Sequence, residues 1–310
     1  MNAVYTKYGA IKDYLNLEMY GSDQPASLML TGCAEIETPY GTLRPQYEVE
    51  DMGRKEHKCI VFHPNGTVRK VPLQDKQDIE TNYGSITSEM LLFYDNGALK
   101  KLFPLTGKLS GYWTEEKEYA LAEDLNMTLP SGEITAKMIS LGFFKSGNIR
   151  SLTLWPGESV SMNTAAGNIK IRTGISFYED GNIRSLEPLF PTPVETSIGT
   201  LEAFDNDPDG ISGDINSLCF DQSGKVSALC TTSNRVIVTI DSDTQKTYEP
   251  MVKESLCSES VKVAVPLNIE FIGDKVRFNK SNHNVYDIAG CSFEIEAYVA
   301  NLVIPRYECT

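Results

Sequence analysis

One short pattern constrains the fold of this chain more than any other feature of its sequence. A phenylalanine stands four residues before a glycine, and aliphatic residues stand two and five residues after that glycine. The pattern occurs five times, around Gly66, Gly97, Gly147, Gly181 and Gly224. Two apolar runs separated by a short loop that contains glycine are typical of a β-hairpin. The sequence therefore predicts five antiparallel hairpins.

The residues around the glycine also predict the type of turn. A type I′ turn would need a positive φ angle at Ser146 and Ser223, which precede the glycine in two copies. It would also place Pro64 where the strand needs an N–H group. A type I turn followed by a glycine bulge meets both requirements. In that register Phe177 lies opposite Ile183, which predicts a buried row of phenylalanine–aliphatic pairs, one per hairpin.

A second glycine-centred phrase alternates with the first. It contains Gly41, Gly84, Gly132, Gly167 and Gly199, and the last three follow one another at intervals of 35 and 32 residues. Self-similarity at such a period is the signature of a stacked repeat array. The predicted fold is all-β: an elongated array of five double-hairpin antiparallel repeats with irregular N-terminal and C-terminal caps.

The repeats suggest three regions. Residues 1–32 form an N-terminal cap, either a short helix or the first strands, and residues 33–232 hold the five tandem repeats. Residues 233–310 are a β-rich C-terminal cap or a small second domain, and the polar stretch 241–259 is the candidate linker. Insertions interrupt the period at 48–58, 106–126 and 205–214. Thr114 and the two glutamates after it predict one short helix in the second insertion.

Charge and cysteine usage restrict the partners and the compartment. The net charge is −14 and the isoelectric point is about 4.8, which disfavours nucleic acids and anionic membrane surfaces as partners. The chain has no apolar run long enough to cross a membrane, and its first residues show no signal-peptide pattern. Its seven cysteines are scattered singly, which predicts reduced thiols used as small buried hydrophobes in a cytoplasmic protein.

The third insertion has the only recognisable metal-binding pattern. Its acidic residues alternate before a glycine, as the oxygen ligands of a calcium loop do. It resembles the DxDxDG loops of the thrombospondin type-3 kind. By that resemblance, the ligands would be the side chains of Asp205, Asp207, Asp209 and Asp214 and the carbonyl group of Ile211. The alternative is a hydrated acidic hairpin tip. Calcium is the only cofactor that the sequence suggests, and none is required.

The second insertion supplies a candidate binding surface. Tyr112, Trp113 and Tyr119 lie in it, and Trp155 follows nearby in the sequence. Such aromatic residues can form a platform for a sugar or a peptide, or they can be buried as a lid over the edge of the repeats. Departures from a repeat period usually lie on loops, and loops carry binding sites.

Catalytic motifs are absent from the sequence. It contains no GxSxG, HExxH or phosphate-binding loop pattern. His63 occupies the tyrosine position of a hairpin, which predicts a structural role, and His57 is expected to be solvated. Glu115, Glu116 and Glu118 are expected to form a solvated helix face. A glycosidase-like carboxylate pair stays open, because distance in three dimensions defines it.

The phrase F-Y-x-x-G-x-I-x-S-L at residues 177–186 resembles the hairpin unit of MORN-type repeats, in the variant found in bacterial antitoxin-like proteins. The resemblance covers only this hairpin, and here a second, non-aromatic hairpin alternates with it. It implies an elongated antiparallel β array with a protein-interaction role, and it transfers no functional residue.

The leading hypothesis is a non-catalytic interaction or scaffold protein whose partner is a protein. A surface module that binds carbohydrate or calcium is the first alternative. A hydrolase with a carboxylate site is the second.

Overall fold

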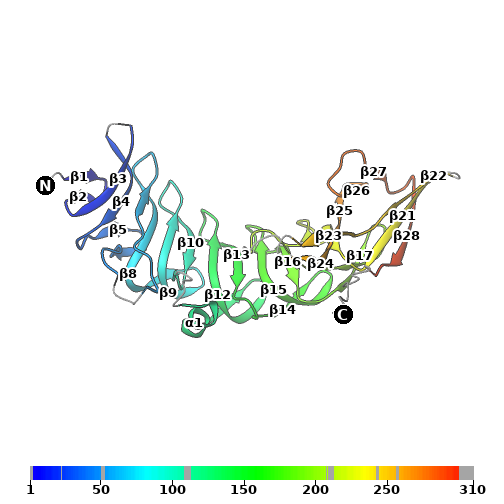
Figure 1. Ribbon diagram of the computed structural model, residues 1–310, viewed down its shortest axis with the longest axis horizontal. Coiled ribbons are helices and arrows are strands. Elements are labelled where there is room, and N and C mark those ends of the chain that lie inside the picture. The colour runs from blue at the N-terminus through cyan, green and yellow to red at the C-terminus, as the bar shows by residue number, and fades with distance from the viewer. Residues whose placement is uncertain are drawn as a thin grey trace, which may run out of the picture. The chain divides into compact units, whose positions relative to one another are not determined.

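The computed structural model describes residues 3–21, 23–49, 53–107, 113–206, 208, 213–241, 244–255 and 258–299. Within these ranges the fold is all-β, as the sequence predicts, and its one helix is α1 (Glu115–Leu121) (Figure 1). None of the described residues forms a helix both long and apolar enough to cross a membrane. The chain divides into two compact units: Met1–Glu158 with Glu179–Gly181, and Ser159–Tyr178 with Asn182–Thr310. We call them unit 1 and unit 2.

Unit 1 is built on one antiparallel ladder whose strands pair in chain order. The ladder runs through β3 (Tyr14–Tyr20), β4 (Gln24–Leu30), β7 (Ile60–Phe62), β8 (Val68–Thr81), β9 (Gly84–Phe93), β10 (Leu99–Phe103), β12 (Gly132–Phe143) and β13 (Ile149–Leu154). β11 (Asp124–Leu129) pairs with the first half of β12. Two small hairpins complete the unit: β1 (Val4–Thr6) with β2 (Gly9–Ile11), and β5 (Ile36–Thr38) with β6 (Gly41–Leu43).

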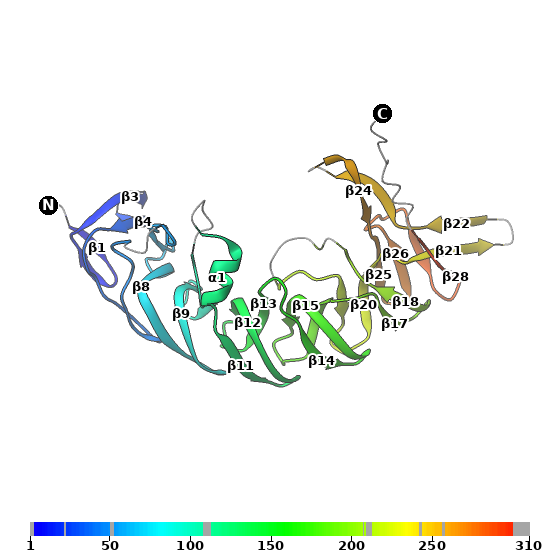
Figure 2. The same ribbon diagram turned by 60° about the horizontal axis from the view of Figure 1, so that its bottom comes forward.

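Unit 2 has a ladder of the same kind (Figure 2). It runs through β14 (Val160–Thr164), β15 (Gly167–Phe177), β16 (Ile183–Pro188), β19 (Leu218–Phe220), β20 (Val226–Thr231), β25 (Leu267–Ile272), β26 (Lys275–Phe278) and β27 (Val285–Asp287). The unit also holds the hairpins β17 (Thr192–Thr196) with β18 (Gly199–Ala203) and β23 (Met251–Ser255) with β24 (Ser258–Val265). A further sheet joins β22 (Thr244–Tyr248), β21 (Asn234–Asp241) and β28 (Ser292–Ala297).

The five phenylalanine hairpins form with the predicted turn. Their central glycines have φ angles of 83° to 88°, in the left-handed region that glycine adopts readily. In one copy, Gly97 N–H donates to Tyr94 O at 3.0 Å and Tyr94 N–H donates to Ala98 O at 2.8 Å, as in a type I turn with a glycine bulge. The predicted pairs all form: Phe62–Val68, Phe93–Leu99, Phe143–Ile149, Phe177–Ile183 and Phe220–Val226. The first three pairs are buried as predicted, but Ile183 and Val226 are only half-buried.

The aliphatic residue five positions after each glycine lies at the centre of the core. Cross-strand pairing in unit 1 aligns these residues with leucines of the intervening strands, in the row Val71, Leu91, Leu102, Leu141 and Leu152. All five side chains are fully buried. Unit 2 repeats the arrangement in the row Ile175, Leu186, Leu218, Leu229, Ile269 and Phe278. Burial of these rows contributes to the hydrophobic stabilisation of each ladder.

In three of the five hairpins, the residue after the phenylalanine bonds its hairpin to the next one along the ladder. In unit 1, Tyr94 Oη donates to Phe143 O at 2.9 Å, and His63 Nε2 is 3.0 Å from Phe93 O. In unit 2, Tyr178 Oη donates to Phe220 O at 2.9 Å. The structural role predicted for His63 is therefore confirmed. These bonds give the exposed hairpin ends partners that the strand ladder does not supply.

Four hairpins of the second set have two-residue loops held by a threonine, whereas the hairpin around Gly132 has Leu129 at that position. Thr81 Oγ1 donates to Gly84 O at 2.8 Å and accepts from Tyr83 N–H at 3.1 Å. Thr38, Thr164 and Thr196 make the same pair of bonds. Thr6 does so as well in the β1–β2 hairpin. The start of the chain, which the sequence left open between helix and strands, is thus a further copy of this hairpin.

Tyrosines of the threonine hairpins dock on the phenylalanine hairpins of unit 1. The backbone N–H of the first aliphatic residue after each bulge donates to a tyrosine hydroxyl: Val68 to Tyr8 at 3.0 Å, Leu99 to Tyr40 at 2.8 Å, and Ile149 to Tyr83 at 2.9 Å. We call this contact the tyrosine clamp. It joins hairpins that lie about sixty residues apart in the sequence.

Two sequence expectations about the polar segments are wrong. The stretch 241–259 is not a linker, because it carries β22, β23 and the start of β24. Its polar side chains fill exposed positions of paired strands, such as Lys246 opposite Val238. His57 is not solvated either, since its Nε2 atom is buried.

Phe143→Ala should reduce the free energy of unfolding by about 3 to 5 kcal/mol, because it removes a fully buried ring opposite Ile149. Urea denaturation measures the change. Phe144→Ala is the matched control: this neighbouring ring is only half-buried, so we expect a loss of about 1 kcal/mol. Equal losses in the two variants would contradict the buried row.

Tyr83→Phe should remove the acceptor of Ile149 N–H and leave the ring in place. We expect a loss of about 1 kcal/mol and faster hydrogen exchange at the Ile149 amide, measured by NMR. The Leu99 amide, held by Tyr40, is the internal control and should not change. An unchanged exchange rate at Ile149 would mean that the clamp does not protect this amide.

Candidate functional site

Two residues of the predicted aromatic platform, Tyr119 and Trp155, pack against each other. Tyr119 and Trp155 meet edge to face with their ring centroids 6.1 Å apart. Tyr119 Oη donates to Glu158 Oε1 at 2.5 Å, and Lys137 Nζ lies 4.2 Å from the Tyr119 ring centroid. The hydrogen bond to Glu158, followed by burial, raises the pKa of the Tyr119 hydroxyl. These contacts occupy both the ring and the hydroxyl group of Tyr119.

The other two aromatic candidates do not join this pair in the described contacts. Trp113 is half-buried just before α1, with Lys117 Nζ 5.8 Å from its ring centroid. Tyr112 lies outside the described residues. The predicted helix is confirmed at Glu115–Leu121, with Thr114 at its N-cap position.

A buried ion cluster holds the first two insertions against unit 1. Arg54 Nη2 donates to both oxygens of Glu89 at 3.0 Å, and Arg54 Nε lies 3.0 Å from Glu118 Oε1. All three side chains are buried, so the expectation of a solvated face is wrong for Glu118. Burial acts to lower the pKa of Arg54, but Glu89 and Glu118 outweigh it and the pKa is raised. The charges therefore serve the structure: Arg54 from one insertion neutralises Glu118 from the other.

The predicted calcium loop is only partly described. Asp205 and Asp214 lie in the described residues, whereas Asp207, Asp209 and Ile211 lie outside them. The backbone oxygen of Asp205 accepts a hydrogen bond from Arg172. No group of three or more metal-ligating side chains occurs among the residues that the structure places.

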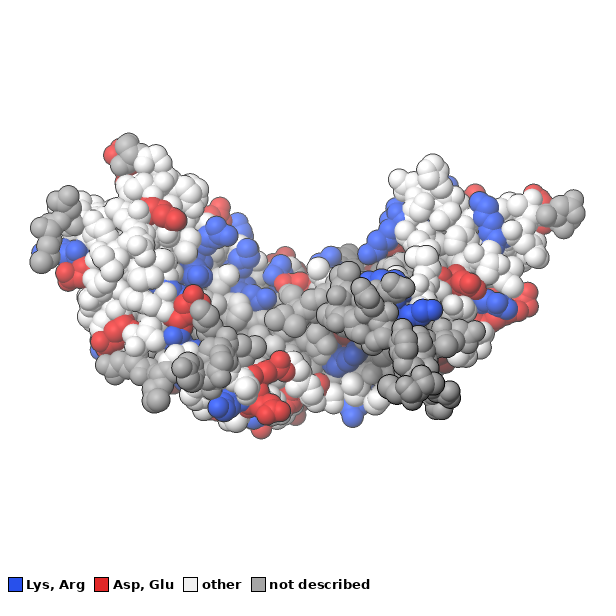
Figure 3. Space-filling model, viewed as in Figure 1, with Lys and Arg blue, Asp and Glu red and all other residues white. Residues whose placement is uncertain are grey.

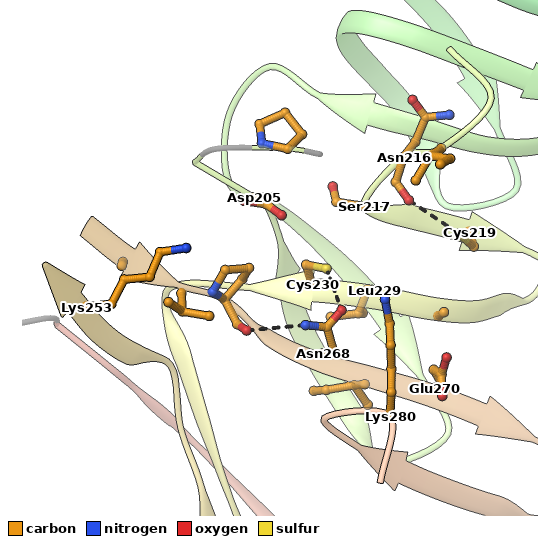
Figure 4. Close-up of a pocket in the computed structure, with 17 residues that line it drawn as sticks. Asp205, Asn216, Ser217, Cys219, Leu229, Cys230, Lys253, Asn268, Glu270 and Lys280 are labelled. Carbon is orange, nitrogen blue, oxygen red and sulfur yellow. Dashed lines mark hydrogen bonds between the residues drawn. The ribbon is translucent and has the colours of Figure 1, made fainter. Parts of the chain in front are cut away.

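Asp205 lies at the edge of a cavity of about 380 Å³ in unit 2 (Figure 4). The floor comes from β19, β20 and β25, which contribute Cys219, Cys230 and Asn268. Hairpin β23–β24 covers one side and contributes Lys253. The cavity is thus built by segments distant in the sequence, and its size falls in the range of small-molecule sites.

Two lysines enter this cavity from different segments (Figure 4). Lys253 comes from β23, and Lys280 comes from the turn after β26, where Asn279 and Lys280 have φ angles of 53° and 55°. Left-handed backbone at a lysine carries strain, and here it aims the side chain at the cavity. Glu270 forms a tight ion pair with Arg277, with Nε and Oε2 2.5 Å apart. Ammonium groups and the amide of Asn268 are suited to binding a small polar or anionic ligand.

The two thiols of the cavity are not nucleophiles at neutral pH. Cys230 Sγ is 3.3 Å from Asn268 Oδ1, and Cys219 Sγ is 3.6 Å from Asn216 O. Burial raises the pKa of Cys219 to about 11 and that of Cys230 to about 12. Both stay protonated, and the thiolate is the reactive form. The described cysteines carry no disulfide. The expectation that they are buried is wrong, because Cys33 is exposed and Cys59, Cys219, Cys230 and Cys291 are half-buried.

Beneath the cavity, Glu187 fixes the position of Ser217. Its two carboxylate oxygens accept from Ser217 N–H at 2.8 Å and from Ser217 Oγ at 2.9 Å. Burial raises the pKa of the Glu187 carboxyl group from 4.5 to about 7, although Ser217 and Arg172 oppose the shift. Glu187 has no exposed surface, so it cannot touch a substrate and acts as a support.

A second candidate surface lies on the ladder of unit 1. Pairing places Lys70, Leu92 and Lys101 in one row across β8, β9 and β10, and Met90 lies opposite Phe103 in the adjacent row. All five side chains are half-exposed. We call this set the basic face, and Figure 3 shows Lys and Arg side chains gathered on one flank of unit 1. It differs in charge from the chain as a whole, whose net charge is −14.

Sequence reasoning missed both surfaces for the same reason. The lysines of the cavity lie 27 residues apart, and those of the basic face lie on different strands. The only early signal was the basic residue after the aliphatic position in several hairpins, as at Arg69 and Lys100.

Comparison with known proteins gives no match to the chain, whether among family models, curated proteins or solved structures.

Glu187 should make stability fall as the pH rises. The folded protein keeps a proton on this carboxyl group up to a pH of about 7, whereas the unfolded chain releases it near 4.5. Between about pH 5 and 8 this group alone should therefore lower the free energy of unfolding by on the order of 3 kcal/mol.

Urea denaturation across this pH range measures the effect. Glu187→Gln stays neutral at every pH, so its stability should depend less on pH than that of the wild type. Glu195→Gln, at an exposed site in the same unit, is the control and should follow the wild type. Parallel curves for wild type and Glu187→Gln would contradict the raised pKa.

Proposed function

We propose that this protein is a non-catalytic interaction protein whose β-hairpin repeats present a binding surface to another protein. The observation that carries the proposal is the basic face, where paired strands place Lys70, Leu92 and Lys101 side by side and half-exposed. Mixed basic and apolar surface of this kind favours a partner segment with acidic and apolar side chains.

The repeat scaffold supports the same conclusion. We propose an elongated array of five double-hairpin antiparallel units, similar to MORN-type repeats, with caps at residues 1–32 and 233–310. The shared pairs Phe62–Val68 and Phe143–Ile149 support equivalence of the units. Repeat proteins of this kind keep core positions constant and vary their surfaces, which suits protein recognition. We place the protein in the cytoplasm, with no nucleic acid or membrane as partner.

The use of the buried ionisable groups also favours binding over catalysis. Arg54 and Lys55 offset the charges of Glu89 and Glu118, and Glu187 supports Ser217. Each of these groups is occupied by a structural contact. Burial lowers the pKa of Lys58, and the neighbouring charge of Lys70 on the basic face lowers it further.

A small-ligand module is the second candidate, and the cavity of Figure 4 favours it. Lys253 and Lys280 suit an anionic or hydroxyl-rich ligand such as a carbohydrate acid. Calcium stays an alternative at Asp205 and Asp214. A thermal shift in millimolar calcium chloride that is lost in Asp214→Ala would support calcium.

A photo-cross-linking residue in place of Leu92 tests the proposed function. We expect it to capture a protein from a cell extract, and the same residue at Leu121, which is exposed on α1, should not capture that protein. The purified partner should bind wild type in a titration. The double variant Lys70→Glu with Lys101→Glu should weaken binding by about tenfold or more, because it places like charges opposite an acidic segment.

Lys76→Glu is the matched control, since Lys76 is exposed on β8 away from the row Lys70, Leu92 and Lys101. It should change the affinity less than about twofold. Equal effects of Lys76→Glu and the double variant would contradict the basic face. Turnover of a glycoside panel by the wild-type protein would overturn the non-catalytic proposal.

A further inference from the structure

Neither threonine hairpin of unit 2 has a tyrosine at the clamp position, which holds Ala166 in β14–β15 and Ile198 in β17–β18. The hairpin β14–β15 corresponds to the hairpin β8–β9 of unit 1, and its loop residues are Ala165 and Ala166 where the other loop has Asn82 and Tyr83. Ala166 therefore stands at the clamp position with a methyl group in place of a phenol.

The backbone around this position keeps the geometry of the intact clamp. Ala166 N–H donates to Thr164 Oγ1 at 3.0 Å, and Tyr83 N–H donates to Thr81 Oγ1 at 3.1 Å. The φ angles of Gly167 and Gly84 are 103° and 102°. The loop therefore holds Ala166 as its counterpart holds Tyr83.

The approach of the two hairpins is also preserved. A Cβ atom built on Gly224 would lie 2.9 Å from Ala165 Cβ, and one built on Gly147 would lie 3.0 Å from Asn82 Nδ2. In both places the first loop residue of the threonine hairpin thus contacts the bulge glycine of the phenylalanine hairpin. Val226 is the first aliphatic residue after Gly224, as Ile149 is after Gly147. Ile149 N–H donates to the hydroxyl of Tyr83, but the equivalent position beside Val226 N–H holds Ala166, which has no hydroxyl group.

The missing ring leaves a groove. The space lined by Ala165, Ala166, Val226, Phe271 and Gly273 belongs to a groove of about 1080 Å³. In unit 1 the corresponding space beside Tyr40 and Leu99 is about 330 Å³. We call the larger groove the open tyrosine slot. Phe271 is half-buried and offers a ring against which an aromatic side chain can pack.

The rim of the slot is mainly acidic. Glu195 and Asp221 line it together with one cation, Lys225. Hydrogen bonds from Ser223 and the backbone lower the pKa of the Asp221 carboxyl group, so it is charged at neutral pH. A ligand that pairs a phenol with a positive charge complements this arrangement.

We propose that the open tyrosine slot binds a tyrosine side chain, flanked by a basic residue, from a partner protein. The ring packs beside Ala166 and Phe271, and its hydroxyl oxygen accepts from Val226 N–H as Tyr83 does from Ile149 N–H. The partner thus supplies in trans the contact that unit 1 makes within its own chain. The slot lies in unit 2 and the basic face in unit 1, so the proposal does not depend on the basic face.

Tyramine and phenethylamine test the proposal, since they differ only in the phenol hydroxyl group. We expect tyramine to shift the Val226 amide resonance in an NMR titration and to bind about fivefold more tightly than phenethylamine, because it alone completes the hydrogen bond. Equal affinities, or a tyramine effect that does not include Val226, would overturn the proposal.

Ala166→Tyr supplies the decisive variant. Its own phenol should fill the slot, abolish the tyramine effect at Val226 and raise Tm by about 2 to 4 °C. Tyr83→Ala is the reverse variant, and it should create a second tyramine response at the Ile149 amide. If Ala166→Tyr still binds tyramine as wild type does, the slot is not the site. Cross-linking from position 92 reports on unit 1 and distinguishes this failure from failure of the proposed function.

Discussion

The left-handed glycine of each phenylalanine hairpin is the constraint on which the rest of the structure depends. It allows a three-residue loop, and the bulge that results sets phenylalanine opposite an aliphatic residue, as in Phe93 and Leu99. The same register aligns the buried row from Val71 to Leu152 across unit 1. A side chain with a Cβ atom at these glycines would oppose the φ angle, shift the register and move the core residues away from one another.

The tyrosine clamp supplies a hydrogen-bond acceptor for a backbone N–H group next to the glycine bulge. A bulge leaves one amide pointing away from its own partner strand, and a buried or half-buried amide without an acceptor is destabilising. In unit 1 the hydroxyls of Tyr8, Tyr40 and Tyr83 meet this need from hairpins far away in the sequence. The contact therefore joins local turn geometry to tertiary packing. Ala166 stands at the clamp position without a hydroxyl group to accept from the amide. This position is therefore a candidate binding site for a hydroxyl group from a partner.

The insertions show how charged segments can be fixed without a large core of their own. Arg54 brings two insertions together through Glu89 and Glu118, and the backbone N–H of Thr106 also donates to Glu89 at 2.8 Å. A buried pair of this kind gains specificity from its directional contacts, because removal of one partner leaves an uncompensated charge. The helix α1 is short, and this cluster rather than its intrinsic propensity holds it in place.

The sequence by itself determined the hairpins, their turn type and the all-β class, because these follow from local spacing of phenylalanine, glycine and aliphatic residues. It also located α1 from Thr114 and the acidic first turn. Only the tertiary structure decided which side chains meet across strands. The sequence predicted a solvated Glu118, but the structure places its carboxylate against Arg54. The sequence offered Trp155 as part of a binding platform, but its ring packs against Tyr119. Such contacts depend on distances between segments far apart in the chain, which periodicity does not encode.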